Sequence, residues 1–335
     1  MIKLQREDST AGHRNVMDNI GNTHTTISES QVLESPFCLD SERAYLDWRA
    51  RKLANYPTEV RDLFVDIRDP HALSVDELKM LTQVCGKTNT VFYRCQQAPF
   101  DAKLVRVLGH QLGLHNLDGN LCSDEDNISA LRVMPDGSRH EGYIPYTDRP
   151  INWHTDGYYN SPDRKIRAMI LHCVNDAASG GTNQILDHEI VYILVRDHDP
   201  ALVEALMAPD AMTIPANVEN GVKIRDAESG PVFSVDPVSG NLHMRYTARK
   251  RSIVWRSDKA TAAWVAFLED LFSRGCDYIY QYRLLPGEGV ISNNALHNRT
   301  GFVDDADKGK TRLIYRARYY DRVMNTDLHD LYYQE

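Results

Sequence analysis

The sequence predicts a mainly β protein with flanking helices, an α+β class in which the strands form a barrel or a sandwich. Apolar residues recur at helical spacing up to about residue 112, whereas after Leu131 short β-like runs alternate with Gly, Pro, Asn and Asp. No internal repeat and no linker rich in Pro, Gly or Ser divides the 335 residues. We therefore expect one domain over residues 31–335, with a helical part at about 40–130 and a β core at about 131–322.

Residues 1–30 are polar throughout and contain no apolar run long enough for a signal-peptide core or a membrane span. We expect a flexible arm here. A segment so rich in Asn, Thr and Ser can also order over an active site, or over a neighbouring subunit if the protein is a homo-oligomer.

The composition limits the compartment and the partners. Six cysteines are scattered without a C-x-x-C pair, which predicts neither a disulfide framework nor a zinc module and favours a reducing cytoplasm. The net charge of -9 disfavours nucleic acid as a partner, because phosphate binding depends on clustered Lys and Arg. We expect a small-molecule partner and no membrane.

Helical spacing of apolar residues predicts helices over residues 42–53 and 100–112, and Ser74-Val-Asp-Glu has the composition of a helix start. Two further helices are predicted over residues 187–195, with another turn after Pro200, and over 258–274. Strands are predicted over 168–174, 231–235 and 241–247. The last two flank a Gly-containing turn, which indicates an antiparallel hairpin.

The most informative stretch is Asn152-Trp-His154-Thr-Asp156. In a β-strand, residues two apart project from the same face, so His154 and Asp156 would point inward together. The pair alone does not establish a metal site. Thirteen histidines are expected to give about one His-x-Asp match by chance, and a His and an Asp that hydrogen-bond across a strand or turn would show the same pattern.

His297 follows a short apolar run and a polar turn, a pattern able to place an imidazole at a strand end. With His154 and Asp156 it would complete a facial triad of two imidazoles and one carboxylate. Such a triad leaves three metal positions open for a co-substrate and oxygen. A structural histidine bonded to backbone groups is the alternative explanation of His297 alone.

A predicted strand over residues 311–320 places Arg312, Ile314, Arg316 and Arg318 on one face. Either these arginines face water, or they look into a barrel and bind an anion. A guanidinium clamps a carboxylate through two parallel hydrogen bonds, which suits a dicarboxylic co-substrate whose other end chelates the metal.

The order His154-x-Asp156, then His297, then Arg312-x-x-x-Arg316 resembles the taurine dioxygenase family of iron(II)/2-oxoglutarate oxygenases. Within that family the chain looks closest to the γ-butyrobetaine hydroxylase branch. The segments that carry this likeness are Tyr146-Thr147, His154-Thr155-Asp156, Leu171-His172-Cys173 and Gly180-Gly181 followed by Asp187. The chain lacks the cysteine-rich N-terminal zinc module of some butyrobetaine hydroxylases, which leaves the substrate open.

The resemblance implies a double-stranded β-helix core of the jelly-roll or cupin type. It implies Fe(II) bound by His154, Asp156 and His297, with 2-oxoglutarate and O2 as co-substrates. Arg312 would bind the distal carboxylate of 2-oxoglutarate, and Arg316 would assist it or reach the substrate. Thr182 or Asn183 would also contact the co-substrate, and the spacing does not separate these two.

The expected reaction is hydroxylation of an unactivated carbon in a small polar metabolite of the amino acid, betaine or sulfonate type, with desaturation or cyclisation as other outcomes. Candidate substrate residues are Tyr146, Asn152, Tyr158, Tyr159 and Arg245; core packing explains many tyrosines equally well, and a solvated strand end explains Arg245 and Arg249. Two rival functions are a cupin-type isomerase or hydrolase that does no oxygen chemistry and a non-catalytic binding protein on the same fold.

Overall fold

We describe the protein from a computed structural model covering residues 35–95, 101–119, 127–135, 143–219 and 221–332. The predicted arm, residues 1–30, lies outside the described residues. Within the described ranges, no helix is long and apolar enough to cross a membrane.

Six described strands form the larger sheet, in the spatial order β1-β2-β16-β5-β19-β3. Their bounds are β1 Phe64–Ile67, β2 Thr90–Cys95, β3 Ser129–Leu131, β5 Ala168–Asn175, β16 Glu288–Ser292 and β19 Leu313–Tyr319. Strands β1 and β2 run parallel, and the other neighbouring pairs run antiparallel. The predicted strand over 168–174 is therefore confirmed as β5, at the centre of this sheet.

The smaller sheet has the order β15-β7-β17-β4 and is antiparallel throughout. Its strands are β4 Ile151–His154, β7 Asn183–Leu186, β15 Tyr280–Tyr282 and β17 Leu296–Arg299. Short strands extend the fold, namely β6 Ser179–Gly180 with β18 Phe302–Val303, β8 Met212–Ile214 with β11 Glu228–Gly230 and β14 Val254–Trp255, β9 Asn217–Glu219 with β10 Val222–Arg225, and β12 Phe233–Val235 with β13 Leu242–Met244. The last pair is the predicted antiparallel hairpin.

The α-helices are α2 Glu42–Leu53, α3 Val75–Thr88, α4 Ala102–Gln111, α5 His188–His198, α6 Pro200–Met207, α7 Lys259–Arg274 and α8 Leu328–Tyr332. Short 3-10 turns lie at η1 Val60–Leu63, η2 Ile144–Tyr146, η3 Pro162–Arg164, η4 Lys250–Ser252 and η5 Ala306–Lys308. The Ser74 side chain caps α3 by accepting from the Glu77 backbone N–H. The Asp258 side chain caps α7 by accepting from the Thr261 backbone N–H. The predicted helices are confirmed, with shifts of a few residues at their ends.

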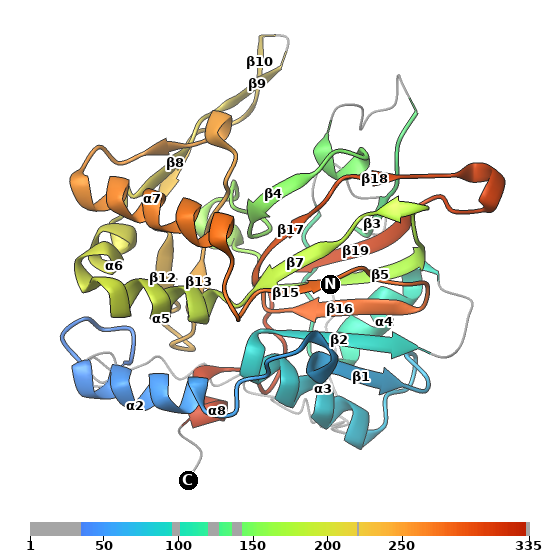
Figure 1. The fold of residues 1–335 in the computed structure, drawn as a ribbon, viewed down its shortest axis with the longest axis horizontal. Coiled ribbons are helices and arrows are strands. Elements are labelled where there is room, and N and C mark those ends of the chain that lie inside the picture. The colour runs from blue at the N-terminus through green and yellow to red at the C-terminus, as the bar shows by residue number, and fades with distance from the viewer. Residues whose placement is uncertain (1–34, 96–100, 120–126, 136–142, 220, 333–335) are drawn as a thin grey trace, which may run out of the picture.

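The helical part predicted at about residues 40–130 contains helices α2, α3 and α4, but it also contains strands that the sequence did not predict. Strands β1, β2 and β3 come from this part and join the larger sheet, where β1 and β2 lie beside α3 in Figure 1. The run Thr90-Val-Phe-Tyr is buried on both faces, so it shows no alternation of apolar and polar residues. A short, fully buried strand of this kind cannot be separated from helix by periodicity.

Two apolar clusters lie on opposite faces of the larger sheet. One, which includes Leu81, Leu104 and Ala317, packs that sheet against α3 and α4. The other, which includes Ile314 and Ile185, fills the space between the two sheets and continues to α5, α6 and α7, the helices grouped at one end of the sheets in Figure 1. We call this second cluster, between the two sheets, the inner cluster. Ile314 belongs to it, so Arg316 and Arg318, which lie on the same face of β19 as Ile314, point toward the smaller sheet.

Candidate active site

The three predicted ligands meet at the inner face of the smaller sheet. His154 ends β4, and His297 lies directly opposite it in β17, with their imidazole centroids 4.3 Å apart. One ligand atom from each of His154, Asp156 and His297 falls within 4.8 Å of the others. This spacing fits a single metal ion bound by all three side chains.

Asp156 does not continue the strand, contrary to the expectation for a β His-x-Asp pair. Strand β4 ends at His154, and Asp156 opens a turn that continues through Tyr159. The Asn294 side chain fixes this turn: its Oδ1 accepts from the Asp156 N–H at 2.7 Å, and its Nδ2 donates to the Asp156 carbonyl at 3.0 Å. The same Nδ2 donates to the Ile166 carbonyl at 2.7 Å.

Both histidines are oriented for metal binding. Nδ1 of His154 donates to the Asn152 carbonyl and Nδ1 of His297 donates to the Ala295 carbonyl, each at 2.9 Å. A carbonyl only accepts, so each Nδ1 carries the proton and each Nε2 keeps its lone pair. Burial, and then the neighbouring His297, lowers the pKa of His154 to about 3, and burial lowers the pKa of His297. Both imidazoles are therefore neutral at physiological pH, as metal ligands must be.

Asp156 is held as a carboxylate. Burial alone would raise its pKa, but the guanidinium groups of Arg316 and Arg318 outweigh burial and hold it below the usual range. Arg316 Nη1 lies 3.4 Å from Asp156 Oδ1, while the buried Asp156 Oδ2 has no hydrogen-bond partner among the described residues. The carboxylate thus keeps one oxygen free for a cation. The family resemblance assigned Arg316 to the co-substrate or the substrate, and the structure places it against the carboxylate of Asp156.

Arg312 is a buried cation without an ion pair among the described residues. Its guanidinium lies 5.1 Å from the centroid of the Phe302 ring, and its Nη1 has no hydrogen-bond partner in the described part of the chain. Burial lowers the pKa of Arg312 to about 10. Because an unpaired buried cation is unfavourable, this position suits an anionic ligand.

The model of the "Taurine catabolism dioxygenase TauD, TfdA family" matches residues 50–318, which is more than half of the chain. The chain belongs to this family. It is therefore a 2-oxoglutarate-dependent oxygenase that uses Fe(II) and O2, and the oxygenase hypothesis is confirmed over the isomerase or hydrolase and over the binding protein. The triad supplies two imidazoles and one carboxylate with a free oxygen, the donor set that iron of this class requires.

Solved structures of this family's fold resemble the chain. An asparagine oxygenase in complex with Fe(II), 3-hydroxyasparagine and succinate is 17% identical, with a TM-score of 0.53, and the match covers 88% of this chain and 92% of that one. A taurine dioxygenase from Burkholderia xenovorans is 15% identical, with a TM-score of 0.51 and coverage of 77% and 87%. These likenesses confirm the predicted jelly-roll core.

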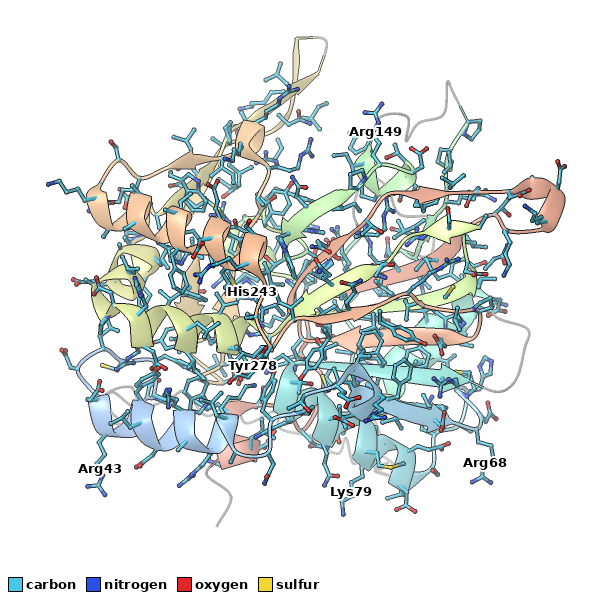
Figure 2. All side chains as sticks on the ribbon, viewed as in Figure 1. Arg43, Arg68, Lys79, Arg149, His243 and Tyr278 are labelled. Atoms are coloured by element: carbon cyan, nitrogen blue, oxygen red, sulfur yellow. The ribbon has the colours of Figure 1, made fainter. Side chains whose placement is uncertain are left out.

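Arg299, a residue that sequence reasoning missed, is a second buried arginine beside Phe302. It lies 4.8 Å from the centroid of that ring and donates to the carbonyls of Thr147 and Arg149. The Arg149 side chain itself points away from the molecule in Figure 2. Arg299 thus fastens the segment that leads into β4 to the strand that carries His297. Its place two residues after His297 puts it on the same face of the strand, but that spacing does not specify its bonds to the two carbonyls.

Thr182 and Asn183 differ in their positions relative to strand β7. Asn183 pairs with Arg299 across β7 and β17, on the face that carries Ile185 and His297. Thr182 precedes β7; its carbonyl accepts from the Thr300 N–H, and its own N–H donates to Thr300 Oγ1. Asn183 is therefore the member of the pair on the inner face.

The Gly180-Gly181 segment reaches the same region. Gly180 has φ +70, and a Cβ there would lie 2.2 Å from the Gly301 carbonyl oxygen, so only glycine fits beside β18. Gly181 lies next to the side chain of Arg312.

The candidate substrate residues are placed in four different ways. Tyr146 is buried in the inner cluster, and Asn152 is exposed on β4. Tyr158 and Tyr159 follow Asp156 in its turn and pack edge to face. The guanidinium of Arg245 donates to four backbone carbonyls, those of Tyr158, Met212, Glu228 and Gly230. Arg245 thus fastens the turn to β8 and β11, and its donors are not directed at a ligand.

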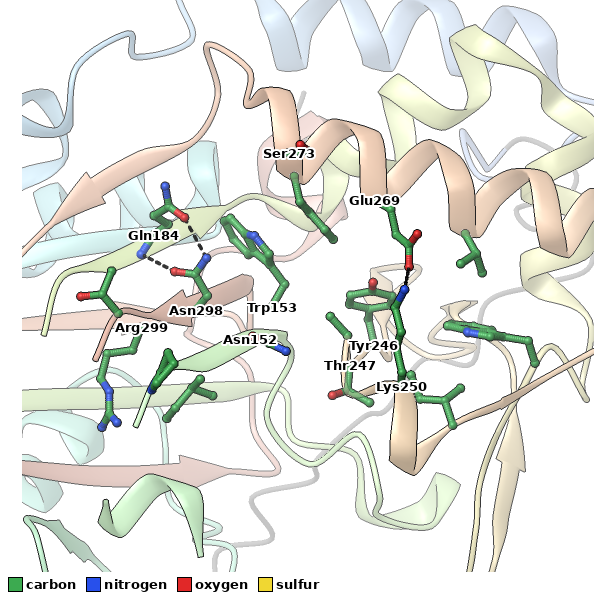
Figure 3. A pocket seen from close by; sticks show the side chains of 18 residues that line it. Asn152, Trp153, Gln184, Tyr246, Thr247, Lys250, Glu269, Ser273, Asn298 and Arg299 are labelled. Carbon is green, nitrogen blue, oxygen red and sulfur yellow. Dashed lines mark hydrogen bonds and ion pairs between the residues drawn. The ribbon is translucent and has the colours of Figure 1, made fainter. Parts of the chain in front are cut away.

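A cavity of about 500 Å³ lies between the smaller sheet and α7 (Figure 3). Trp153, Gln184 and Asn298 form part of its wall, with Gln184 and Asn298 bonded to each other. Trp153 and Asn298 directly neighbour His154 and His297 in their strands and so point to the opposite face. None of the three predicted metal ligands lines this cavity, so it is separate from the candidate metal site.

Proposed function

We propose that His154, Asp156 and His297 bind Fe(II), that Arg312 binds the distal carboxylate of 2-oxoglutarate, and that Asn183 contacts the same co-substrate. When bound, the iron, 2-oxoglutarate and O2 supply the oxidising power to hydroxylate a C–H bond, with succinate and carbon dioxide as co-products. The observation that supports the co-substrate site best is the buried Arg312 with its unbonded Nη1, directly before the strand that supplies Arg316.

The residues of this chain supply orientation and protonation states. Two backbone carbonyls hold the imidazoles with Nε2 available, Arg316 keeps Asp156 ionised, and Asn294 fixes the turn that carries it. The inner cluster and the low exposure of the triad limit access of water to the reacting groups.

For the prime substrate we propose a small polar metabolite of the amino acid, betaine or sulfonate type. The likeness to the γ-butyrobetaine hydroxylase branch supports this choice through the order of Tyr146-Thr147, His154-Thr155-Asp156 and Gly180-Gly181. His172, from the Leu-His-Cys segment, bonds to Tyr93 on the outer face of the larger sheet and so does not contribute to substrate choice directly.

The experiment is a 2-oxoglutarate turnover assay on iron-loaded protein. We expect 2-oxoglutarate to produce the weak visible band of its iron chelate, and succinate release to rise when an accepted amine, amino acid or sulfonate is added. Protein that neither binds the keto acid nor releases succinate would contradict the proposal. The Arg312→Ala variant, which keeps the triad, distinguishes loss of the co-substrate site from loss of iron.

A further inference from the structure

Asn89 connects the end of helix α3 to the turn that precedes His297. It is fully buried and lies in the left-handed region at φ +52, directly before β2 (Figure 1). Its carbonyl accepts from the Asn293 N–H at 2.9 Å and from Ser292 Oγ at 3.0 Å, and its Oδ1 accepts from Asn293 Nδ2 at 3.2 Å. Asn89 therefore contacts the turn between β16 and β17 through both its backbone and its side chain.

This turn leads to Asp156. Asn294 directly follows Asn293, and its side chain bonds to both the N–H and the carbonyl of Asp156. The Asn293 side chain has two further partners, because its Oδ1 accepts from the Val323 N–H at 3.2 Å and its Nδ2 also donates to Thr326 Oγ1 at 3.0 Å. Asn293 is thus held from several sides, which fixes the point from which Asn294 reaches Asp156.

The same turn also leads to His297. Ser292 Oγ donates to the Asn89 carbonyl and accepts from the Ala295 N–H at 3.0 Å. The Ala295 carbonyl accepts from Nδ1 of His297 at 2.9 Å, the bond that leaves Nε2 available for a metal. One hydroxyl therefore links Asn89 to the residue that orients the His297 imidazole.

The side chain of Asn89 is fixed in one orientation. Its Nδ2 donates to Asp187 Oδ1 at 2.9 Å, and its Oδ1 accepts from Arg322 Nη2 at 2.7 Å in addition to the Asn293 amide. Asp187 is paired in turn with the buried ammonium of Lys52 at 2.7 Å. With an acceptor on one side and donors on the other, rotation of the amide would leave buried polar groups without partners.

We propose that Asn89 is a positioning residue for the metal site, which holds the β16–β17 turn and through it the relative placement of Asp156 and His297. The rival explanation is that Asn89 only ends α3 and completes the buried polar network. Its loss would then lower stability and leave the metal site unchanged. The inference rests on the proposed function, because it takes Asp156 and His297 as iron ligands.

The experiment compares the full-length wild type with Asn89→Gly. Glycine adopts the left-handed conformation readily and keeps the backbone carbonyl, so only the side-chain bonds are lost. In an anaerobic Fe(II) titration we expect the Kd for iron to rise about tenfold, as for other residues that orient metal ligands, with one iron per chain at saturation. Asn55→Gly is the matched control and should keep the wild-type Kd, because Asn55 is exposed and also lies in the left-handed region, at φ +51, just beyond α2.

A second control and a readout without metal separate positioning from a general loss of stability. Leu81→Ala removes a buried apolar side chain from α3 and should lower the free energy of unfolding without changing the Kd for iron. In iron-free protein, the Asp156 and Ala295 amide hydrogens should exchange faster in Asn89→Gly than in wild type, relative to the amide hydrogens of β5. Leu81→Ala should leave this ratio unchanged.

Rescue of the side-chain bond provides a further test. The double variant Asn89→Asp with Asp187→Asn exchanges the amide and the carboxylate across one hydrogen bond and keeps an acceptor for Asn293. It should recover part of the iron affinity that Asn89→Gly loses. If Asn89→Gly does not fold, Asn293→Ala breaks the same side-chain bond and should show the same rise in Kd.

The results distinguish this inference from the proposed function. If wild-type protein binds iron and Asn89→Gly binds it equally well, the positioning role is overturned and the proposed function stands. The positioning role is also overturned if Leu81→Ala weakens iron binding as much as Asn89→Gly does. If wild-type protein binds no iron, the proposed function fails and the inference fails with it.

Discussion

The side chain of Asn294 holds Asp156 by both of its backbone polar groups, accepting from the N–H at 2.7 Å and donating to the carbonyl at 3.0 Å. Asn294 lies in the turn between β16 and β17, in the left-handed region at φ +57, a conformation that asparagine tolerates better than most residues. That turn leads to His297. A single amide therefore fixes the position of one proposed metal ligand, Asp156, relative to another, His297.

Replacing Asn294 by Ala should weaken metal binding without removing any ligand. The buried N–H of Asp156 would lose its acceptor, and the Asp156 and Ile166 carbonyls would lose their donor. We expect iron affinity to fall about 10- to 100-fold, as for other residues that orient metal ligands. Iron titration of the variant measures this. Asn298→Ala, which removes an amide from the outer face of β17, is the control and should bind iron as the wild type does.

Replacing Arg312 by Ala should remove the anchor of 2-oxoglutarate. Loss of a charge-assisted contact of about 1.5–3 kcal/mol predicts an increase in the KM for 2-oxoglutarate of roughly 10- to 100-fold. Arg312→Lys should recover little, because an ammonium cannot make the bidentate contact. Iron stoichiometry should stay unchanged in both variants. An unaltered KM in Arg312→Ala would assign the co-substrate carboxylate to another residue.

Acid should destabilise the protein through His172. Burial lowers the pKa of this imidazole from 6.5 to about 4, and its Nδ1 lies 2.9 Å from the Tyr93 hydroxyl. The unfolded chain therefore binds a proton on His172 before the folded protein does, so stability is present above pH 6.5 and is lost as the pH falls toward 4. This group alone contributes about 2 kcal/mol of loss between pH 7 and pH 5.

Urea unfolding of wild type and His172→Gln at these two pH values tests that expectation. The variant should lose less stability than the wild type on acidification. His110→Gln, at an exposed position on α4, should follow the wild type. Equal pH dependence in wild type and His172→Gln would show that His172 titrates normally in the folded protein.

Lys52 should be necessary for stability. Its ammonium is fully buried and pairs with Asp187 at 2.7 Å and with Glu189. Asp187 also caps α5 and accepts hydrogen bonds from the side chains of Tyr56 and Asn89. The aspartate that follows Gly180-Gly181 in the family resemblance therefore has a structural role. Lys52→Met would leave buried carboxylates without a counter-charge, at a cost of about 3–5 kcal/mol.

The unfolding free energy from urea titration measures the effect of Lys52→Met. Lys79→Met is the matched control, because Lys79 is exposed on α3 and projects outward in Figure 2. The double variant Lys52→Met with Asp187→Asn should recover part of the loss. If Lys52→Met unfolds like the control, the buried pair contributes nothing to stability.

The chemistry of the site was more accessible to sequence reasoning than its geometry. His154, Asp156 and His297 were found because metal ligands are few in kind and follow a fixed order. The local structure around these residues was not predicted. Asp156 lies in a turn, and its position depends on a hydrogen bond from its N–H to Asn294, which is far away in sequence. The roles of Asn294 and Arg299 are hydrogen bonds to backbone groups, which no residue pattern specifies.

The same distinction applies to the fold. Helix α3 could be predicted because Ser74 and Glu77 form a capping box within four residues. Strand β2 could not be predicted in this way. It is buried through pairing with β16, nearly 200 residues later in the sequence, and its continuous run of buried residues shows no periodicity. The inward direction of Arg316 likewise required the second sheet, since a strand pattern alone does not say which face is buried.

The triad itself is tested most directly by anaerobic Fe(II) titration of wild type and His154→Ala, with iron stoichiometry and the visible band of the 2-oxoglutarate chelate as readouts. We expect one iron per chain and a band for the wild type and for the exposed-site control His198→Ala. We expect neither iron nor band for a folded His154→Ala. Full iron stoichiometry with an unchanged band in His154→Ala would contradict the assignment of the metal site.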